Sequence, residues 1–268
     1  MIPLRDDIRA RRVPVVNYVL IAITSLVFIM QLSEGPEDAS LVERFGMIPK
    51  RVLHPDEPVI VESLQVHPLT GRYVRVQHEA APSPLPVWLT LLTCIFLHGG
   101  WMHFLSNMWF LYIFGDNVED RLGAWKFTLF YLGTGVAASI THLATNAASP
   151  VPTIGASGAI AGVMGAYFLL YPRATVLTII PIFFFIQLVH LPAALFLGIW
   201  FLLQFLQGSL AITAGQATGV AWWAHIGGFA AGFVVIIGLR QAGLLRTASV
   251  EVIHRTPNNR FIRDRRWR

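Results

Sequence analysis

The chain has 268 residues, of which 54% are hydrophobic and only 13% are charged. A soluble globular domain usually carries about 25% charged residues. The mean hydropathy of +0.58 points the same way, and these values exclude a disordered chain, a coiled coil and an ordinary cytosolic enzyme. They predict one membrane-embedded domain with modest soluble parts. The single cysteine, Cys94, excludes an intrachain disulfide and a cysteine-based metal cluster.

Apolar runs recur along the chain. They lie at about 15–32, 87–114, 125–145, 155–171, 174–207 and 221–239. A helix needs roughly 20 residues to cross the hydrocarbon. We interpret 87–98 as a surface or re-entrant piece before a span at 101–115. We interpret 174–190 as a loop or interfacial stretch before a span at 192–207. The sequence thus predicts an all-α polytopic membrane protein, a six-transmembrane-helix bundle with a long outer first loop at 33–86.

Basic residues flank the apolar runs and set the expected orientation. They gather near both termini, and in a six-span bundle Arg121, Lys126 and Arg173 fall on the same side. The connections at 146–154 and 208–220 carry no charge. Because an excess of Lys and Arg marks the cytoplasmic side, both termini are expected there, in a cell membrane that we take to be a prokaryotic inner membrane. The expected parts are a cytoplasmic N-terminal segment (1–14), the membrane domain (15–240) and a basic cytoplasmic tail (241–268).

The sequence pI of about 9.8 raises the question of nucleic acid as a partner. The basic residues that cause it flank the apolar spans, and such a tail more often binds anionic lipid. We therefore expect the lipid bilayer as a partner and no nucleic acid.

Four polar side chains share one layer inside the apolar runs. Counted from the charged residue that ends each span, Ser157 and His225 lie roughly 22–24 Å above the cytoplasmic surface, at about 1.5 Å per residue. The same ruler places His103 at about 20 Å and Asn107 at about 14 Å. Strongly polar residues inside a bilayer are costly and usually functional. Their shared depth predicts a site below the outer face.

The chemistry that fits these residues is nucleophilic catalysis. A serine hydroxyl needs a base to take its proton, and histidine is the usual base. Since no Asp or Glu occurs between Asp120 and Glu251, Ser157 and His225 would form a dyad rather than a triad. The run that starts at Ser157 is too short to span the membrane, so the preceding loop must dip into it beside a water-filled cavity.

Several groups could stabilise an oxyanion at this point. Ser157 would begin a helix, where free backbone N–H groups and the helix dipole favour an anion. The Asn107 amide, an N–H of His103 and the Ser157 N–H could serve as donors. Small-residue stripes that include Gly158 on one helix, and Gly228 and Gly232 on another, would allow the close approach that a dyad requires.

Each of these residues also has an ordinary interpretation. A membrane serine usually bonds to its own helix, and a lone histidine can simply bridge helices. Metal binding by His98 and His103 is disfavoured, because their spacing is poor for one helix face and no carboxylate or Cys completes the site. We expect no metal and no cofactor. The tryptophans, Trp200 and Trp222 among them, are expected to be interface anchors or packing residues.

The motifs taken together resemble those of the rhomboid intramembrane serine proteases. The matching stretches are His98-Gly-Gly-Trp-Met-His103-Phe-Leu-Ser-Asn107, Gly115-Asp-Asn-Val-Glu119, Gly155-Ala-Ser157-Gly158 and Ala224-His225-Ile-Gly-Gly228-Phe-Ala-Ala-Gly232. Their order, spacing and placement on the spans agree over roughly residues 15–240. The resemblance implies a six-span serine endopeptidase that cleaves single-span membrane proteins in or near their transmembrane segments.

The resemblance also implies a role for each matched residue. Ser157 would be the nucleophile, His225 the base, and His103 and Asn107 the lining of the oxyanion hole. The structural positions would be His98, Gly155, Gly158, Gly228 and Gly232. Two family features are missing: Trp88 is not followed by Arg, and Ala161 stands where some members have a Tyr that stacks on the base. The second departure leaves open what positions His225.

Two rival functions follow from the same sequence. A non-catalytic rhomboid-like protein would bind membrane helices, but such relatives usually lack one or more of the four site residues. A transporter or channel would usually need carboxylates or paired charges inside the membrane. The gate for substrate is expected at the uncharged 208–220 connection and its neighbouring span.

Overall fold

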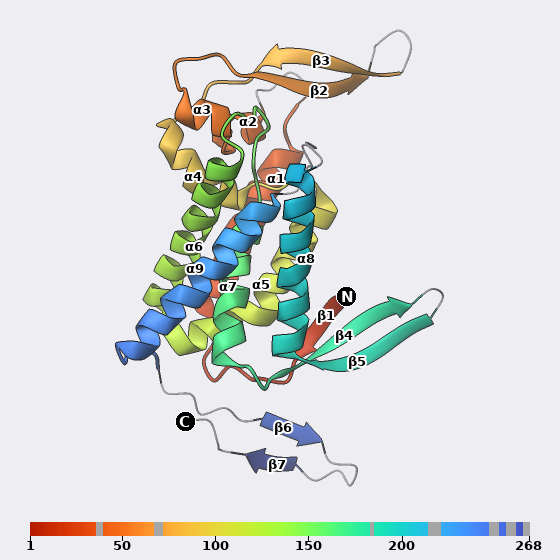
Figure 1. The fold of residues 1–268 in the computed structure, drawn as a ribbon, viewed down its shortest axis with the longest axis vertical. Coiled ribbons are helices and arrows are strands. Elements are labelled where there is room, and N and C mark those ends of the chain that lie inside the picture. Colours follow the sequence, from red (N-terminus) through yellow and green to blue (C-terminus); the bar gives the residue numbers. More distant parts are fainter. Residues whose placement is uncertain are drawn as a thin grey trace.

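The protein is a helical bundle with small β-sheets at its two ends (Figure 1). The structure is a computed structural model that describes all residues except 36–39, 67–71, 183–184, 214–220, 247–251, 256–260 and 265–268. The long helices are α1 (Val15–Leu32), α5 (Trp101–Leu122), α6 (Ala124–Thr145), α7 (Ser157–Leu170), α8 (Ala193–Thr213) and α9 (Trp222–Gln241). Each coincides with an apolar run of the sequence.

Within the described residues, four helices are long and apolar enough to cross a membrane: α1, α6, α8 and α9. A fifth candidate is a bent pair, in which the 87–96 segment meets α5 at an angle of 80°. That segment consists of η1 (Val87–Leu89), α4 (Thr90–Thr93) and η2 (Cys94–Phe96). The chain is therefore polytopic, as predicted. The count of six spans stays a prediction, because α7 has only 14 residues.

The expectation of an all-α fold is wrong in one respect, because the chain also forms sheets. The stretch at 174–190, expected as a loop or interfacial stretch, is an antiparallel hairpin of β4 (Thr175–Ile182) and β5 (Phe185–Pro192), and β1 (Ile2–Asp6) pairs with β4. Runs of Thr, Val, Ile and Phe favour strands, a preference that overall hydropathy does not reveal. Another short hairpin, β6 (Val252–Arg255) with β7 (Phe261–Asp264), lies in the tail.

The hairpin β4–β5 projects sideways from the bundle (Figure 1). Adjacent residues of β5 point to opposite faces, yet Phe185 and Ile186 are 73% and 74% exposed. A ribbon that presents apolar side chains on both faces is poorly suited to water. Its position beside the lower end of α8 fits the lipid interface.

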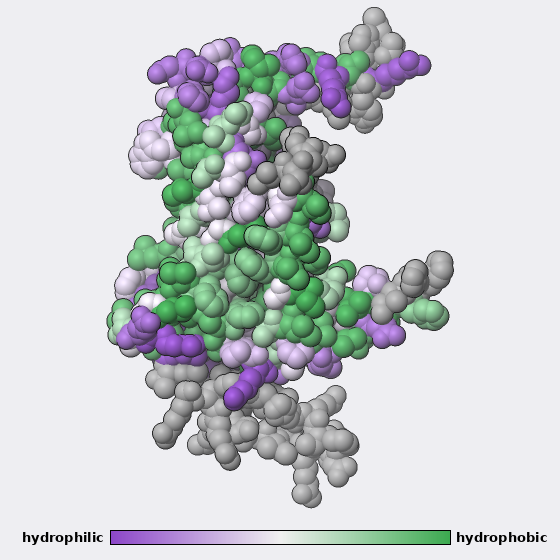
Figure 2. Space-filling model, in the orientation of Figure 1, coloured by the Kyte–Doolittle hydropathy of each residue, from purple (hydrophilic) through white to green (hydrophobic). Residues whose placement is uncertain are grey.

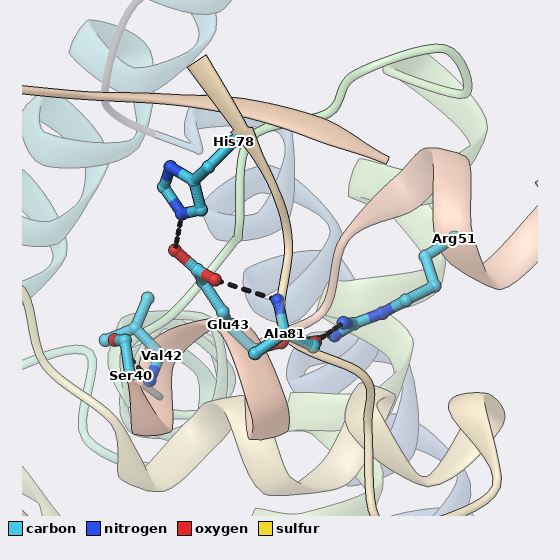
Figure 3. A network of polar contacts seen from close by, with 6 residues as sticks. All are labelled: Ser40, Val42, Glu43, Arg51, His78 and Ala81. Atoms are coloured by element: carbon cyan, nitrogen blue, oxygen red, sulfur yellow. Dashed lines mark hydrogen bonds and ion pairs between the residues drawn. The ribbon is translucent and has the colours of Figure 1, made fainter. Parts of the chain in front are cut away.

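The 33–86 segment is folded rather than a plain loop. It contains α2 (Leu41–Phe45), α3 (Pro49–Leu53) and a hairpin of β2 (Ile60–Val66) and β3 (Tyr73–Glu79), at the opposite end of the bundle from β1 and β4 (Figure 1). Figure 3 shows the polar contacts that join these pieces. The Glu43 carboxylate accepts from the Ala81 N–H at 2.9 Å and contacts His78 Nε2 at 2.8 Å. Arg51 donates to the carbonyls of Ala81, Glu43 and Gly46.

Helix α7 lies at the centre of the bundle, flanked by α5, α6, α8 and α9 (Figure 1). All its residues from Gly158 to Tyr167 are buried. The outer surfaces of the surrounding helices are apolar, and Figure 2 shows hydrophobic side chains covering the middle of the bundle, with hydrophilic ones at both ends. Such a belt is the expected surface of a membrane-spanning bundle.

Candidate active site

Ser157 and His225 meet between the two central helices. Ser157 is the first residue of α7, and His225 lies in the first turn of α9. The Ser157 hydroxyl oxygen is 2.7 Å from His225 Nε2. This distance is within hydrogen-bond reach, as transfer of the serine proton to a base requires. At the far ends of the same helices, the Arg240 guanidinium donates to the Leu169 carbonyl at 2.9 Å.

Glycines bring the backbones of α7 and α9 into contact. A Cβ built on Gly228 would overlap the carbonyl oxygen of Gly158, and one on Gly232 would overlap the carbonyl oxygen of Gly162. On the other side of α7, a Cβ on Gly158 would come within 2.5 Å of the Ala138 side chain. Of the glycine positions expected to be structural, Gly158, Gly228 and Gly232 therefore lie at the α7–α9 contact that sets the Ser157–His225 distance.

His103 lies against the turn that precedes Ser157. Gly155 in this turn has a φ of 124°, and a Cβ there would lie 2.7 Å from His103 Nε2. The Gly99 N–H donates to His103 Nδ1 at 3.3 Å. A neutral ring that accepts at Nδ1 carries its proton on Nε2. An N–H donor thus faces the backbone immediately before Ser157.

Asn107 is buried on the same helix face, one turn after His103. Its side-chain N–H donates to the His103 carbonyl at 2.8 Å. Over the described residues no hydrogen bond joins Asn107 to Ser157. A side-chain amide has two N–H groups, so this bond leaves a second donor.

His98 lies at the bend before α5. Its backbone N–H and carbonyl pair with the side chain of Gln31, at 3.0 Å each. Its buried ring contacts Phe28, Phe104 and His103 edge-on. These contacts fasten the bend to α1. Sequence reasoning missed Gln31, because an amide near the end of an apolar run gives no signal by itself.

Sequence reasoning also missed Gln204, which contacts His225. Gln204 on α8 places Oε1 2.6 Å from His225 Nδ1. Trp200, one turn earlier, lies 5.8 Å from the imidazole between ring centroids, and Trp222 contacts it edge-on at 6.2 Å. These two tryptophans were expected as interface anchors or packing residues, and they pack on the imidazole. Gln204 could have been noticed as one of two amides in the α8 run.

A small cavity adjoins Ser157. Its lining includes Ser157, Gly158, Gly135, Ala138 and Ser139. The larger side chains of Ile95 and Ile154 also line it, so the cavity has room for only a small group beside the serine hydroxyl.

Comparison with known proteins places the chain in a family. Residues 86–242 match the rhomboid domain model, which is more than half of the 268 residues. The chain therefore belongs to the rhomboid family. With its several apolar helices it is an integral, multi-pass membrane protein.

Similar proteins come from plants and bacteria. The chain is 44% identical over 80 residues to "Rhomboid-like protein 11, chloroplastic" of Arabidopsis thaliana, covering 29% of this chain and 27% of the relative. It is 39% identical over 80 residues to "Putative rhomboid protease YdcA" of Bacillus subtilis, covering 30% and 40%. It is 43% identical over 79 residues to "Rhomboid protease GluP" of the same organism, covering 30% and 15%. The chain thus spans well under half the length of these relatives.

Proposed function

We propose that the protein is an intramembrane serine endopeptidase that hydrolyses peptide bonds in or near the transmembrane segments of single-span membrane proteins. The observation that carries this proposal is the 2.7 Å contact between Ser157 Oγ and His225 Nε2 at the start of two central helices. Membership of a family whose relatives include proteins named as proteases supports it.

The proposed reaction proceeds in two stages. His225 Nε2 takes the hydroxyl proton while Ser157 Oγ bonds to the scissile carbonyl carbon, which forms a tetrahedral oxyanion. The oxyanion collapses, the C–N bond breaks, and His225 returns the proton to the leaving amine. Water then attacks the acyl-serine with His225 as base, which releases the second product and restores Ser157.

The oxyanion is stabilised by donors aimed at the space in front of Ser157. The backbone N–H groups at the start of α7 have no partner within their own helix, and the dipole of α7 adds a positive end. The His103 Nε2–H and the second N–H of Asn107 are the proposed side-chain donors. A preorganised donor of this kind contributes about 3–4 kcal/mol to transition-state stabilisation.

The cavity beside Ser157 supports a preference in the substrate. The resemblance to the family implies a small residue at the scissile position, and the small size of this cavity supports it. The peptide must also be extended at the serine, because a helix hides its backbone. We therefore propose substrates with a helix-weak segment near the outer face of the membrane.

The proposed orientation places both termini in the cytoplasm and the 33–86 segment outside. Basic residues support it: Arg121 and Lys126 donate to the backbone just after α9, at the end of the bundle where β1 pairs with β4. Ser157 begins α7 at the other end, nearer the 33–86 segment. Location in a prokaryotic inner membrane stays a prediction, since relatives occur in plants and bacteria.

The test uses purified protein in liposomes with a single-span model substrate and a fluorophosphonate probe. Wild type is compared with Ser157→Ala and His225→Ala, and folding is verified by thermal unfolding. We expect cleavage and labelling by the wild type alone. Cleavage that persists in Ser157→Ala would exclude the proposed nucleophile. Folded wild type that neither cleaves nor labels would favour a non-catalytic helix-binding protein, and solute flux would favour a transporter.

A further inference from the structure

Gln204 stands out on α8 because it is a polar residue that faces inward between lipid-facing neighbours. It is 7% exposed, whereas Leu203 and Phe205 on either side are each 45% exposed. Burying an amide among apolar helices is unfavourable unless it is hydrogen-bonded. Its partner is Nδ1 of the His225 ring, which lies 2.6 Å from Gln204 Oε1.

This contact determines where the imidazole carries its proton. An amide oxygen can only accept a hydrogen bond, so Nδ1 must be the N–H of the neutral ring. Nε2 then holds the lone pair, and it faces the Ser157 hydroxyl at 2.7 Å. The other tautomer would place a proton on Nε2 and could not accept one from serine.

We infer that Gln204 is the positioning residue of the dyad, which holds His225 in the tautomer and ring orientation that general-base catalysis needs. The inference rests on the proposed function. It also accounts for the absence of a tyrosine at position 161, because the ring is held by Gln204 and Trp200 of α8 instead. A neutral amide does this without placing a carboxylate in the membrane, where a charge is costly.

The first test reads the tautomer directly in the wild-type protein. Solid-state NMR of ¹⁵N-histidine-labelled protein in liposomes, with the His225 signals assigned from the His225→Ala spectrum, distinguishes Nδ1–H from Nε2–H. We expect the neutral ring of His225 to be the Nδ1–H form. A resting wild type in the Nε2–H form would overturn the inference without recourse to any Gln204 variant.

The second test removes the acceptor while keeping the length of the side chain. Gln204→Met should lower kcat about tenfold or more, because general-base catalysis contributes at least 10²-fold and part of it is lost with the tautomer. KM should stay within about twofold. The matched control is Gln207→Met, the same change at an exposed position on the same helix, which should leave kcat, KM and the NMR signals unchanged.

Two outcomes of the variant experiment would contradict the inference. One is a Gln204→Met protein with wild-type kcat. The other is a loss of activity with the Nδ1–H form still fully populated, which would make Gln204 a packing residue only. Failure of the proposed function is distinguishable, because it would appear as cleavage that survives Ser157→Ala while the tautomer measurement stands by itself.

Discussion

At the scale of single residues, the site depends on glycines as much as on its reactive groups. The Gly228 Cα faces the carbonyl of Gly158, one residue from the nucleophile, so any side chain there must push α9 away from α7. His225 lies three residues before Gly228 on the same helix and would move with it. The Ser157–His225 distance is therefore set by backbone contact.

Gly228→Ala is predicted to reduce cleavage more than tenfold and to lower the free energy of unfolding by about 1–3 kcal/mol, the usual cost of overpacking. Gly238→Ala is the matched control, since nothing lies within 4 Å of a Cβ at Gly238 of the same helix. It should preserve cleavage and stability. Equal effects of the two changes would show that the α7–α9 contact does not set the site.

A second residue-scale feature is the carboxyl of Asp6 at the end of β1. Asp6 Oδ2 accepts from the Tyr167 hydroxyl at 2.5 Å and from the Asn117 amide at 2.8 Å. Burial, with a smaller effect of the neighbouring Asp7, raises the pKa of Asp6 from its usual 3.8 to about 7, against the opposing hydrogen bond from Tyr167.

This shift predicts a pH dependence of stability. Between about pH 4 and pH 7 the folded state keeps the Asp6 proton that the unfolded state has lost, so stability falls as the pH rises through this window. Asp6→Asn should flatten that part of the profile, measured as the thermal unfolding temperature in detergent from pH 5 to pH 8. Asp56→Asn, an exposed carboxyl in the 33–86 segment, should leave the slope as in wild type. An unchanged slope in Asp6→Asn would rule out Asp6 as its source.

At the scale of elements, the 33–86 segment supports the loop that leads to Ser157. Met47 and Thr153 pair through both backbone hydrogen bonds, at 3.1 and 2.8 Å, and the Lys50 N–H donates to the Ser149 carbonyl. Arg51 holds the segment together from inside, since it is 7% exposed and donates to three carbonyls. The segment thus holds the backbone at 149–155, the loop that positions Ser157.

Arg51→Met is predicted to lower the free energy of unfolding by about 2–3 kcal/mol, because three buried or part-buried carbonyls lose their donor. Cleavage should slow as the loop before Ser157 loosens. Arg75→Met is the control, since Arg75 is 80% exposed and its contact with Glu62 is a surface ion pair, worth about 0–1 kcal/mol. Normal stability of Arg51→Met, measured by chemical unfolding in detergent, would contradict this account.

Helices were predictable from the sequence because long apolar runs have few alternatives in a bilayer. The sequence could predict that Ser157 and His225 lie close together, because the depth of each in the membrane follows from the helical rise per residue, counted from the end of its span. The hairpin at 175–192 could not be predicted from hydropathy, which does not distinguish an apolar strand from an apolar helix. Gln31 and Gln204 were missed for another reason: the role of an amide in an apolar run depends on the partner that packing brings to it, which the sequence does not show.

At the scale of the whole molecule, the bundle has two chemically different ends. Figure 1 shows the 33–86 segment at one end and β1, β4 and the tail at the other. The proposed orientation predicts opposite labelling of two cysteines with equal exposure, Ile60→Cys and Leu244→Cys, each 49% exposed. In a Cys94→Ser background, an impermeant maleimide should label position 60 in intact cells and position 244 only after lysis. The reverse pattern would invert the topology.

The inward-facing amide of α8 has a consequence for the timing of proteolysis. Helix α8 supplies both Gln204 and Trp200 to the histidine, yet much of its outer surface is exposed. If a substrate helix must displace α8 to reach the site, the outward movement of α8 removes the contacts of Gln204 and Trp200 with His225. Substrate entry and peptide-bond cleavage then cannot occur at the same time. The substrate is cleaved only after α8 has returned to its position beside His225. Membrane proteins that contact α8 only briefly would therefore not be cleaved.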